Sequence, residues 1–344
     1  MSPPDVAQPS VRRATITDVA EAAGASRSTT SRALSGQGYV SPQVRDRVQK
    51  AADRLGYVPD AMARGLKQKT STTIGLLVSD LRNSFYAQMA AGASRTAKDL
   101  GFTIMLADTA SEAVDEVSAA RTFLGQRVSG VIVTPVSAAV VDYLTAQSIP
   151  TVEVDRTFGG RRTDSVTVSN AEGVAEATEH LIGFGHRRIA LIIDETDWTT
   201  GGQRHLGFRS ALERHGIRPD PDLVVSTGWD ARAAEEASTR LLSRTDRPTA
   251  VFAANNVIAE GLWRSAARLG LRIPEDLSVV AFDDAPWMSM VSPGITTVAQ
   301  DPAALGQSAL RQLVERVENP LTPRRSIVLA TELVVRGSAG PCPE

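Results

Sequence analysis

Residues 15–36 read TITDVAEAAGASRSTTSRALSG, and this stretch decides the fold at the amino-terminal end of the chain. It opens with a Thr followed three positions later by an Asp, a capping box that predicts a helix running to about Ala23. Gly24 can supply the positive φ that ends this helix, and Ser26 can cap a second short helix through Leu34. Two helices joined by so short a turn must cross steeply, as they do in a helix-turn-helix.

The second predicted helix carries side chains that can read the major groove of DNA. They are Arg27, Ser28, Thr29 and Arg32. An Arg side chain can donate two hydrogen bonds to a guanine, while Ser and Thr hydroxyls can bind phosphates or base edges. A helical hairpin that merely packs within its own domain is the alternative interpretation of the same spacing.

A third helix and a short fourth one are predicted after this pair. The Ser-Pro pair at 41–42 is a helix start, and apolar residues follow it at helical spacing until Gly56. Asp60 can then cap a short helix over about 61–67, which Gly65 weakens by about 1 kcal/mol. We expect this fourth helix to be mostly unfolded when it is alone.

These signals give the domain boundaries that we expect. Residues 1–13 contain three prolines and no apolar periodicity, so they are predicted to be a disordered arm. The helix-turn-helix domain takes residues 14–58, and the short fourth helix with its linker takes residues 59–72. A larger body takes residues 73–338, and residues 339–344 are a tail.

Charge is unevenly distributed along the chain, although the formal net charge is only -2. The first 70 residues contain 11 Lys and Arg against 6 Asp and Glu, whereas the remainder contains 26 against 33. A basic front end on an acidic body favours an anionic partner for the front end alone. A basic segment that is merely solvated is the alternative.

In the body, short apolar strands alternate with longer amphipathic helices. Strands are predicted at 74–78, 103–107, 130–133, 189–193, 250–253, 279–282 and 326–335. Helices are predicted at about 84–100, 113–126, 171–184, 202–215, 231–243 and 256–269. This alternation predicts an α/β body of two doubly wound parallel-sheet lobes, with a ligand cleft at the carboxyl ends of the strands. We place the first lobe at about 73–167 and 300–325, and the second at about 168–299 and 326–338.

Several other classes of protein are excluded by the sequence. No apolar run approaches the roughly 18 residues of a membrane span, and no signal peptide is visible, so we expect a cytoplasmic protein without a membrane partner. The single cysteine, Cys342, allows no intrachain disulfide and no cysteine-clustered metal site. There is no Gly-x-Ser-x-Gly elbow and no glycine-rich phosphate loop, and the four His lack metal-ligand spacing. We therefore expect no catalysis, no metal and no cofactor.

The amino-terminal end resembles the DNA-binding region of the lactose-repressor (LacI/GalR-type) transcription regulators, on the stretch quoted above and on VSPQVRDRVQKAADRLGYVPDAMARGL at 40–66. By this resemblance, the DNA-binding positions are Thr17, Arg27, Ser28, Thr29, Arg32, Ala63 and Leu66. By the same resemblance, the short fourth helix, from Asp60 to about Lys67, would be the hinge helix. It would lie in the minor groove of the DNA, with Leu66 as the apolar wedge that opens the central base step. Packing of Leu66 on its own domain is the alternative. Departures from the family pattern at Ala25, Thr30 and Ser35 are packing or turn positions and leave the reading face intact.

The body resembles the effector domain of the same family, which is itself similar to periplasmic sugar-binding proteins. This resemblance implies a ligand site made of Asn83, Phe85, Tyr86, Asp155, Arg156, Arg204, Trp229, Asn255, Asp283 and Gln300. Carboxylate, guanidinium and amide groups suit the hydroxyls of a sugar, and Phe85 and Trp229 would sandwich the apolar face of its ring. Each residue alone has a structural alternative, such as an ion pair between Asp155 and Arg156. Asn256 stands where the family usually has an Asp, which affects the network on the hinge side.

Together these features predict a transcriptional repressor. It would bind a pseudo-palindromic double-stranded DNA operator as a homodimer and respond to a small sugar-like effector between its lobes. No leucine heptads follow the body, so we expect no tetramerising tail. A carbohydrate-processing enzyme, or a sugar-binding protein whose helical module has no regulatory role, is the alternative.

Overall fold

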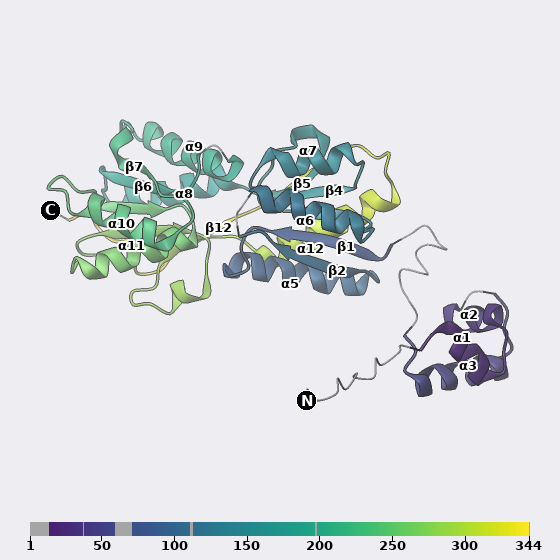
Figure 1. The fold of residues 1–344 in the computed structure, drawn as a ribbon. Helices are drawn as coiled ribbons and strands as arrows, with labels where there is room; N and C mark the ends of the chain where they lie inside the picture. The colour runs from purple at the N-terminus through teal and green to yellow at the C-terminus, as the bar shows by residue number, and fades with distance from the viewer. Residues whose placement is uncertain (1–13, 37, 59–70, 111–112, 197, 344) are drawn as a thin grey trace, which may run out of the picture. The chain divides into compact units, whose positions relative to one another are not determined.

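The computed structural model describes residues 14–36, 38–58, 71–110, 113–196 and 198–343. The chain divides into two compact units, Met1–Ser71 and Thr72–Glu344 (Figure 1). No helix in the described part of the chain is long and apolar enough to cross a membrane. The predicted hinge helix, with Ala63 and Leu66, lies outside the described residues.

The described residues of the smaller unit form three helices, and the bounds of these helices agree closely with the prediction. They are α1 (Ile16–Ala23), α2 (Arg27–Ser35) and α3 (Pro42–Leu55). The Thr15 amide donates to Asp18 Oδ2 at 2.7 Å and the Asp18 amide donates to Thr15 Oγ1 at 3.3 Å, which completes the capping box. Gly24, with a φ of +58°, turns the chain from α1 towards α2. The three helices bury one small apolar core, made of Val19, Ala23, Ala33, Val40, Val48, Ala51 and Ala52.

The larger unit contains two six-stranded sheets, one in each lobe. The first sheet has the order β11-β5-β4-β3-β1-β2, and each of its paired strands runs parallel to its neighbour. Its strands are β1 (Thr73–Val78), β2 (Thr103–Asp108), β3 (Val131–Val133), β4 (Thr151–Val154), β5 (Asp164–Val168) and β11 (Ser326–Leu329). Four α-helices cover it, namely α5 (Ser84–Asp99), α6 (Ala113–Gly125), α7 (Ala138–Ala146) and α12 (Pro302–Glu318). As Figure 1 shows, α5 and α12 lie on one face of the sheet and α6 and α7 lie on the other.

The second sheet has the order β12-β10-β9-β8-β6-β7, with β12 antiparallel to β10. Its strands are β6 (Ile189–Ile193), β7 (Val224–Ser226), β8 (Ala250–Ala253), β9 (Ser278–Phe282), β10 (Thr296–Ala299) and β12 (Glu332–Val334). Its helices are α8 (Asn170–Gly183), α9 (Thr199–Arg214), α10 (Ala231–Leu242) and α11 (Asn256–Arg268). The predicted architecture, a small helical domain followed by two α/β lobes, is confirmed.

The chain passes between the lobes three times: after β5, after β10 and after β11. The single strand predicted at 326–335 is wrong, because β11 pairs with β5 in the first sheet while β12 pairs with β10 in the second. Residues 326–329 therefore belong to the first lobe, and not to the second as predicted. The division between β11 and β12 cannot be predicted from hydropathy, because the run of apolar residues continues from one strand into the other. The division is fixed by tertiary contacts, in which the Thr331 amide donates to Ser169 Oγ at 3.1 Å.

Candidate functional site

The face of α2 carries the predicted base-reading side chains on a firmly capped helix. The Thr29 amide donates to Ser26 Oγ at 3.1 Å, and the hydroxyls of Ser28 and Thr29 each lie 2.9 Å from the same oxygen. Arg27, Ser28 and Arg32 are exposed, and Thr29 is half-buried. Arg32 Nε lies 3.4 Å from the Ser28 carbonyl oxygen, so its guanidinium remains beside this face.

Other residues of the same unit complete the surface. Thr17 on α1 is exposed, as a DNA-contacting side chain must be. Thr30, one of the departures from the family pattern, is fully buried, and its hydroxyl has no hydrogen-bond partner among the described residues. An unpaired buried hydroxyl destabilises a fold, so Thr30 weakens the core without changing the reading face.

In the larger unit, two aspartates follow strands at the carboxyl edges of the two sheets. Asp155 follows β4 in the first lobe, and Asp283 follows β9 in the second. Both have left-handed backbones, with φ values of +70° and +71°, although neither is a glycine. Burial raises the pKa of Asp155, and nearby Arg156 and Arg204 oppose that rise. Strained, buried acids at the ends of parallel strands are typical of binding sites.

Arg156 lies fully buried at the centre of an arginine cluster, made of Ser79, Tyr86, Arg156, Trp198 and Trp229. Its Nη2 donates to Ser79 Oγ and to the Tyr86 hydroxyl, both at 2.7 Å. Its guanidinium carbon lies 4.4 Å from the ring centroid of Trp198 and 4.9 Å from that of Trp229. The tryptophans belong to the second lobe and Arg156 to the first, so the cluster joins the lobes.

Arg204 is also buried, and the second lobe holds it tightly. Its Nε donates to Asn170 Oδ1 at 2.8 Å and its Nη1 donates to the Ala254 carbonyl at 2.7 Å. Its guanidinium carbon lies 3.8 Å from the Phe282 ring centroid. These contacts orient the guanidinium at the point where the chain leaves β5 for α8.

Asn255 and Asp194 are both buried, and they are hydrogen-bonded to each other. Asn255 caps α11, since its Oδ1 accepts from the Ile258 amide at 2.8 Å, and its Nδ2 donates to Asp194 Oδ2 at 3.3 Å. Burial raises the pKa of Asp194, and Arg204 and Arg156 oppose that rise. Asp194 Oδ1 has no hydrogen-bond partner among the described residues.

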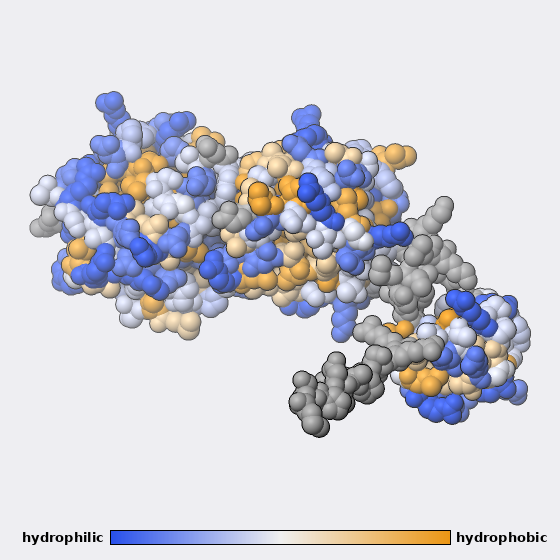
Figure 2. Space-filling view, in the orientation of Figure 1, coloured by the Kyte–Doolittle hydropathy of each residue, from blue (hydrophilic) through white to orange (hydrophobic). Residues whose placement is uncertain are grey.

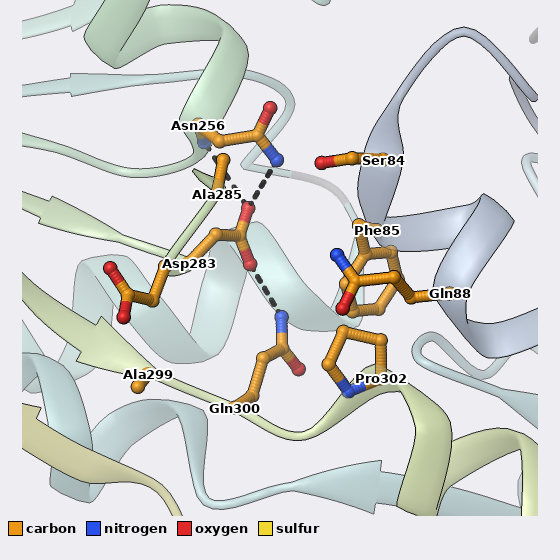
Figure 3. Close-up of a pocket in the computed structure, with 10 residues that line it drawn as sticks. Ser84, Phe85, Gln88, Asn256, Asp283, Ala285, Ala299, Gln300 and Pro302 are labelled. Atoms are coloured by element: carbon orange, nitrogen blue, oxygen red, sulfur yellow. Dashed lines mark hydrogen bonds between the residues drawn. The ribbon is translucent and has the colours of Figure 1, made fainter. Parts of the chain in front are cut away.

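A pocket opens beside Asp283, between the two lobes and the second crossover (Figure 3). This crossover pocket is lined by Ser84, Phe85, Gln88, Asn256, Asp283, Asp284, Ala285, Ala299, Gln300 and Pro302. Asp283 accepts from Asn256 Nδ2 at 2.9 Å and from Gln300 Nε2 at 2.6 Å. Asn256 Nδ2 also lies 3.1 Å from Asn83 Oδ1, so one amide links an acid of the second lobe to the first lobe.

The structure thus places six of the ten predicted effector residues in two neighbouring places and the other four around them. Tyr86, Arg156 and Trp229 lie in the arginine cluster, while Phe85, Asp283 and Gln300 line the crossover pocket. Asn83 is bonded to the pocket residue Asn256, and the remaining three are placed by the acid and arginine contacts described above. Phe85 packs edge-on against Tyr86, and Trp229 packs against Trp198. Phe85 lies in the crossover pocket and Trp229 in the arginine cluster, and the sandwich of a sugar between their rings stays a prediction.

Besides the other residues that line the crossover pocket, sequence reasoning missed four residues that contact Arg156, Arg204 or Asn255. They are Ser79, Asn170, Asp194 and Trp198. Asp194 directly follows the strand at 189–193, and this signal could have identified it, because side chains after parallel strands collect at one edge of a sheet. Trp198 gives no comparable signal, since it stands at the start of a helix and only the tertiary contact with Arg156 reveals it.

Buried polar atoms without partners show what kind of ligand would suit the cleft. Among the described residues, the atoms without a hydrogen-bond partner include the donors Arg156 Nη1 and Trp229 Nε1 and the acceptors Asp194 Oδ1 and Gln300 Oε1. Arg156 Nε also has no hydrogen-bond partner, but it lies 3.6 Å from Asp155 Oδ2, so Asp155 and Arg156 form a buried ion pair. A group rich in hydroxyls can satisfy donors and acceptors together, because each hydroxyl both donates and accepts. In the described part of the chain, no group of three His, Cys, Asp or Glu could hold a metal ion.

The chain is similar to known regulatory proteins over nearly all of its length. The family model described as "Bacterial regulatory proteins, lacI family" matches residues 15–60, and the model described as "Periplasmic binding protein-like domain" matches residues 178–339. The Ribose operon repressor of Haemophilus influenzae is 32% identical over 326 residues, which cover 94% of this chain and 98% of that protein. The HTH-type transcriptional repressor PurR of Photobacterium profundum is 32% identical over 328 residues, with coverages of 94% and 98%.

Solved structures agree with these relatives. The lac repressor dimer bound to operator and the anti-inducer ONPF superposes with a TM-score of 0.85 at 29% identity, covering 96% of this chain and 100% of that chain. The complex of the transcriptional regulator CelR with cellobiose superposes with a TM-score of 0.74 at 32% identity, with coverages of 95% and 100%. The chain belongs to the lacI family of bacterial regulatory proteins, which are DNA-binding transcriptional regulators and not enzymes.

Proposed function

We propose that this protein is a repressor that binds a pseudo-palindromic operator and is controlled by a sugar-like effector. The observation that carries the DNA-binding half is the exposed face of α2, with Arg27, Ser28 and Arg32 on a capped helix in the basic part of the chain. Side chains of these types at the start of a recognition helix read base edges and phosphates. Since its partner is genomic DNA, the protein would act in the cytoplasm.

The effector half of the proposal rests on the cleft between the lobes. Its unpaired donors and acceptors, with Trp198 and Trp229 beside them, suit a ring that carries hydroxyls on its edges and C–H groups on its faces. Some relatives of this chain are named for ribose or were solved with cellobiose, and these relatives support a sugar-like effector.

A homodimer is the assembly that suits such an operator, because each helix-turn-helix reads one half-site of a two-fold symmetric duplex. The lac repressor, to which the chain is similar, was solved as a dimer on its operator. The edge strand β2 of the first lobe supports the same assembly here, because it exposes the apolar side chain of Leu106, which is 43% exposed. Figure 2 shows apolar side chains gathered over this lobe.

Coupling between the two halves would pass through the hinge that joins them. A ligand between the lobes would alter how far they close, and in a dimer this would change the spacing of the two hinges. By the family resemblance, Ala63 and Leu66 of each hinge contact the minor groove of the DNA. A hinge that folds only on DNA is sensitive to such a change. Allosteric coupling of about 1–3 kcal/mol alters DNA affinity by roughly 5 to 150-fold, which is sufficient for a genetic switch.

Selection from random duplexes with the purified full-length protein tests this function. We expect the selected DNA to have two-fold symmetry and the affinity to change when a sugar panel is added. Arg27→Ala should cost about 1–3 kcal/mol of specific binding and relax one base position. Arg218→Ala, the same change at an exposed site of the body, is the control and should have no effect on the selected sequence. Enrichment of no symmetric duplex at low salt would refute the proposal.

A further inference from the structure

Glu153 places a carboxylate inside an otherwise apolar part of the first lobe. It lies on β4, between β3 and β5 in the sheet, and it is 0% exposed. Its strand neighbours Val152 and Val154 belong to the core under α5 and α12, so by strand alternation Glu153 faces the other core, which contains Val141 of α7. A carboxylate is costly in such surroundings unless hydrogen bonds compensate it.

The compensation comes from a single loop, and every described hydrogen-bond partner of the carboxylate is neutral. Glu153 Oε2 accepts from the Phe158 amide at 2.5 Å, and Oε1 accepts from the Gly159 amide at 3.0 Å. Oε1 also accepts from the Thr163 hydroxyl. The backbone packs so closely on the carboxylate that a methyl group added at Gly159 would overlap Glu153 Oε1. Glu153 thus fixes the loop 158–163 to the strand.

This loop continues directly from the residues of the cleft. The hydrogen bonds of Phe158 and Gly159 to Glu153 close an arc of the chain at residues 154–157, which we call the cleft arc. Within the arc, the Arg156 amide donates to the Val154 carbonyl at 2.9 Å around Asp155, whose φ is +70°. A tight turn of this kind is strained, and it persists only where the surrounding structure holds it.

The second lobe contacts the cleft arc as well. The Thr157 amide donates to Thr199 Oγ1 at 3.0 Å, and Thr199 is the first residue of α9. Trp198, directly before Thr199, stacks on the Arg156 guanidinium as described above. The arc is therefore held between a carboxylate inside the first lobe and the start of a helix in the second.

We propose that Glu153 is a positioning residue of the effector cleft, which holds the cleft arc so that Arg156 meets Trp198 and Thr157 meets Thr199. All its described hydrogen bonds go to the loop 158–163, so Glu153 acts on the cleft through the arc. This inference rests on the proposed function, because the same cleft takes the effector. The response to effector then depends on a side chain outside the ten residues that the family resemblance assigns.

A double-mutant cycle in urea unfolding of the full-length protein tests this role without any ligand. Thr199→Val removes the acceptor of the Thr157 amide, and in the parent protein it should lower the folding equilibrium constant about fivefold. In Glu153→Leu, where the arc is released, the same change should have less than about a twofold effect.

Asp164→Asn is the matched control for this cycle. It also replaces a fully buried acid of the first lobe, but this acid lies at the start of β5, and its partners lie on α12 and before β11. Thr199→Val should therefore keep its effect of about fivefold in the Asp164→Asn background. If Glu153→Leu does not fold, Gly159→Ala takes its place, because the added methyl group forces the loop off the carboxylate.

Calorimetry with ribose and cellobiose as probes measures the consequence for effector binding. For whichever of the two binds the parent protein, Glu153→Leu should raise the Kd about tenfold or more, and Asp164→Asn should change it less than about threefold. Glu153→Gln keeps an oxygen that can accept from the Phe158 and Gly159 amides, so it should restore most of the affinity. Thermal unfolding of each variant shows whether a loss of affinity comes from loss of fold.

The possible results separate this inference from the function on which it rests. If Thr199→Val has the same effect in Glu153→Leu as in the parent protein, the positioning role is refuted. An unchanged sugar affinity in Glu153→Leu, or an equal loss in Asp164→Asn, also refutes it. If neither sugar binds the parent protein while the cycle is non-additive, Glu153 keeps its role and the failure concerns the effector class of the proposed function.

Discussion

Several single residues in the cleft adopt conformations or leave polar atoms unbonded in ways that lower the stability of the fold. Asp155 and Asp283 adopt left-handed backbones that cost an L-residue of order 1–3 kcal/mol, and both are buried. Arg156 Nη1 has no hydrogen-bond partner among the described residues, and Arg156 Nε is held only by an ion pair with Asp155 at 3.6 Å. Such costs are tolerated where the surrounding structure fixes the residue, and they are typical of binding sites.

At the residue scale, Arg204 gives a direct prediction. Arg204→Lys keeps the positive charge but cannot donate to Asn170 Oδ1 and the Ala254 carbonyl with one planar group. We expect effector affinity to fall about tenfold or more, while operator affinity without effector stays nearly unchanged. Calorimetry and an operator-binding assay measure the two quantities. An unaltered response to effector would remove Arg204 from the site.

Asn256 gives a second prediction at this scale. Asn256→Asp replaces the amide that donates to Asp283 and Asn83 by a carboxylate, which can only accept when it is ionised. The variant places two carboxylates side by side and removes a bond between the lobes, so we expect about 1–3 kcal/mol of lost stability and more separated lobes. Small-angle scattering and thermal unfolding measure both effects. Asn319→Asp, at an exposed position after α12, is the control, and equal behaviour of the two variants would contradict the linking role of Asn256.

At the scale of elements, the second sheet is closed by the carboxyl-terminal segment, and His186 holds that segment in place. The buried His186 ring lies 2.9 Å from Thr249 Oγ1 through Nδ1, and 3.0 Å from both Ser278 Oγ and the Gly340 carbonyl through Nε2. Burial lowers its pKa, although the contact with Gly340 opposes that shift. The folded state therefore prefers the neutral ring.

This preference predicts a pH dependence of stability. Because the pKa of His186 is lower in the folded state than its ordinary value of 6.5, the unfolded chain binds the proton more readily, and stability falls as the pH drops below about 6.5. We expect His186→Gln to lose less stability than the parent protein between about pH 7 and pH 5. Thermal unfolding at the two pH values measures the slope. His215→Gln, at a half-exposed ring just after α9, is the control, and an unchanged slope in His186→Gln would exclude this role.

Elements were predictable where periodicity was strong. The capping box, Gly24 and the Ser26 cap fixed α1 and α2, because these are local hydrogen bonds and backbone angles. Four strands, β4, β5, β7 and β10, and two helices, α7 and α12, were not predicted. Of the strands, β4, β5 and β10 are buried between helices and lack alternation, and β7 has only three residues, so period gave no signal for them.

At the scale of the whole molecule, the proposed homodimer can be tested at an exposed edge of the first sheet. The edge strand β2 exposes Leu106, and an exposed apolar edge is a natural surface for a second copy of the chain. Sedimentation should show dimers, and Leu106→Lys should raise the dissociation constant about tenfold or more. Leu321→Lys, at a position that is 98% exposed and outside β2, is the control and should remain dimeric. A dimer unaffected by Leu106→Lys would place the interface on another face.

The sequence by itself determined the helix-turn-helix, the two-lobed α/β architecture and most of the residue types that meet at the cleft. These follow from short-range rules: caps, glycine turns, hydrophobic period and the position of polar residues after strands. Only the tertiary structure decided that 326–335 divides between two sheets, that Trp198 stacks on Arg156, and that Gln88 faces Gln300. Each of these depends on a contact between segments far apart in the chain, and such contacts leave no periodic trace in either segment.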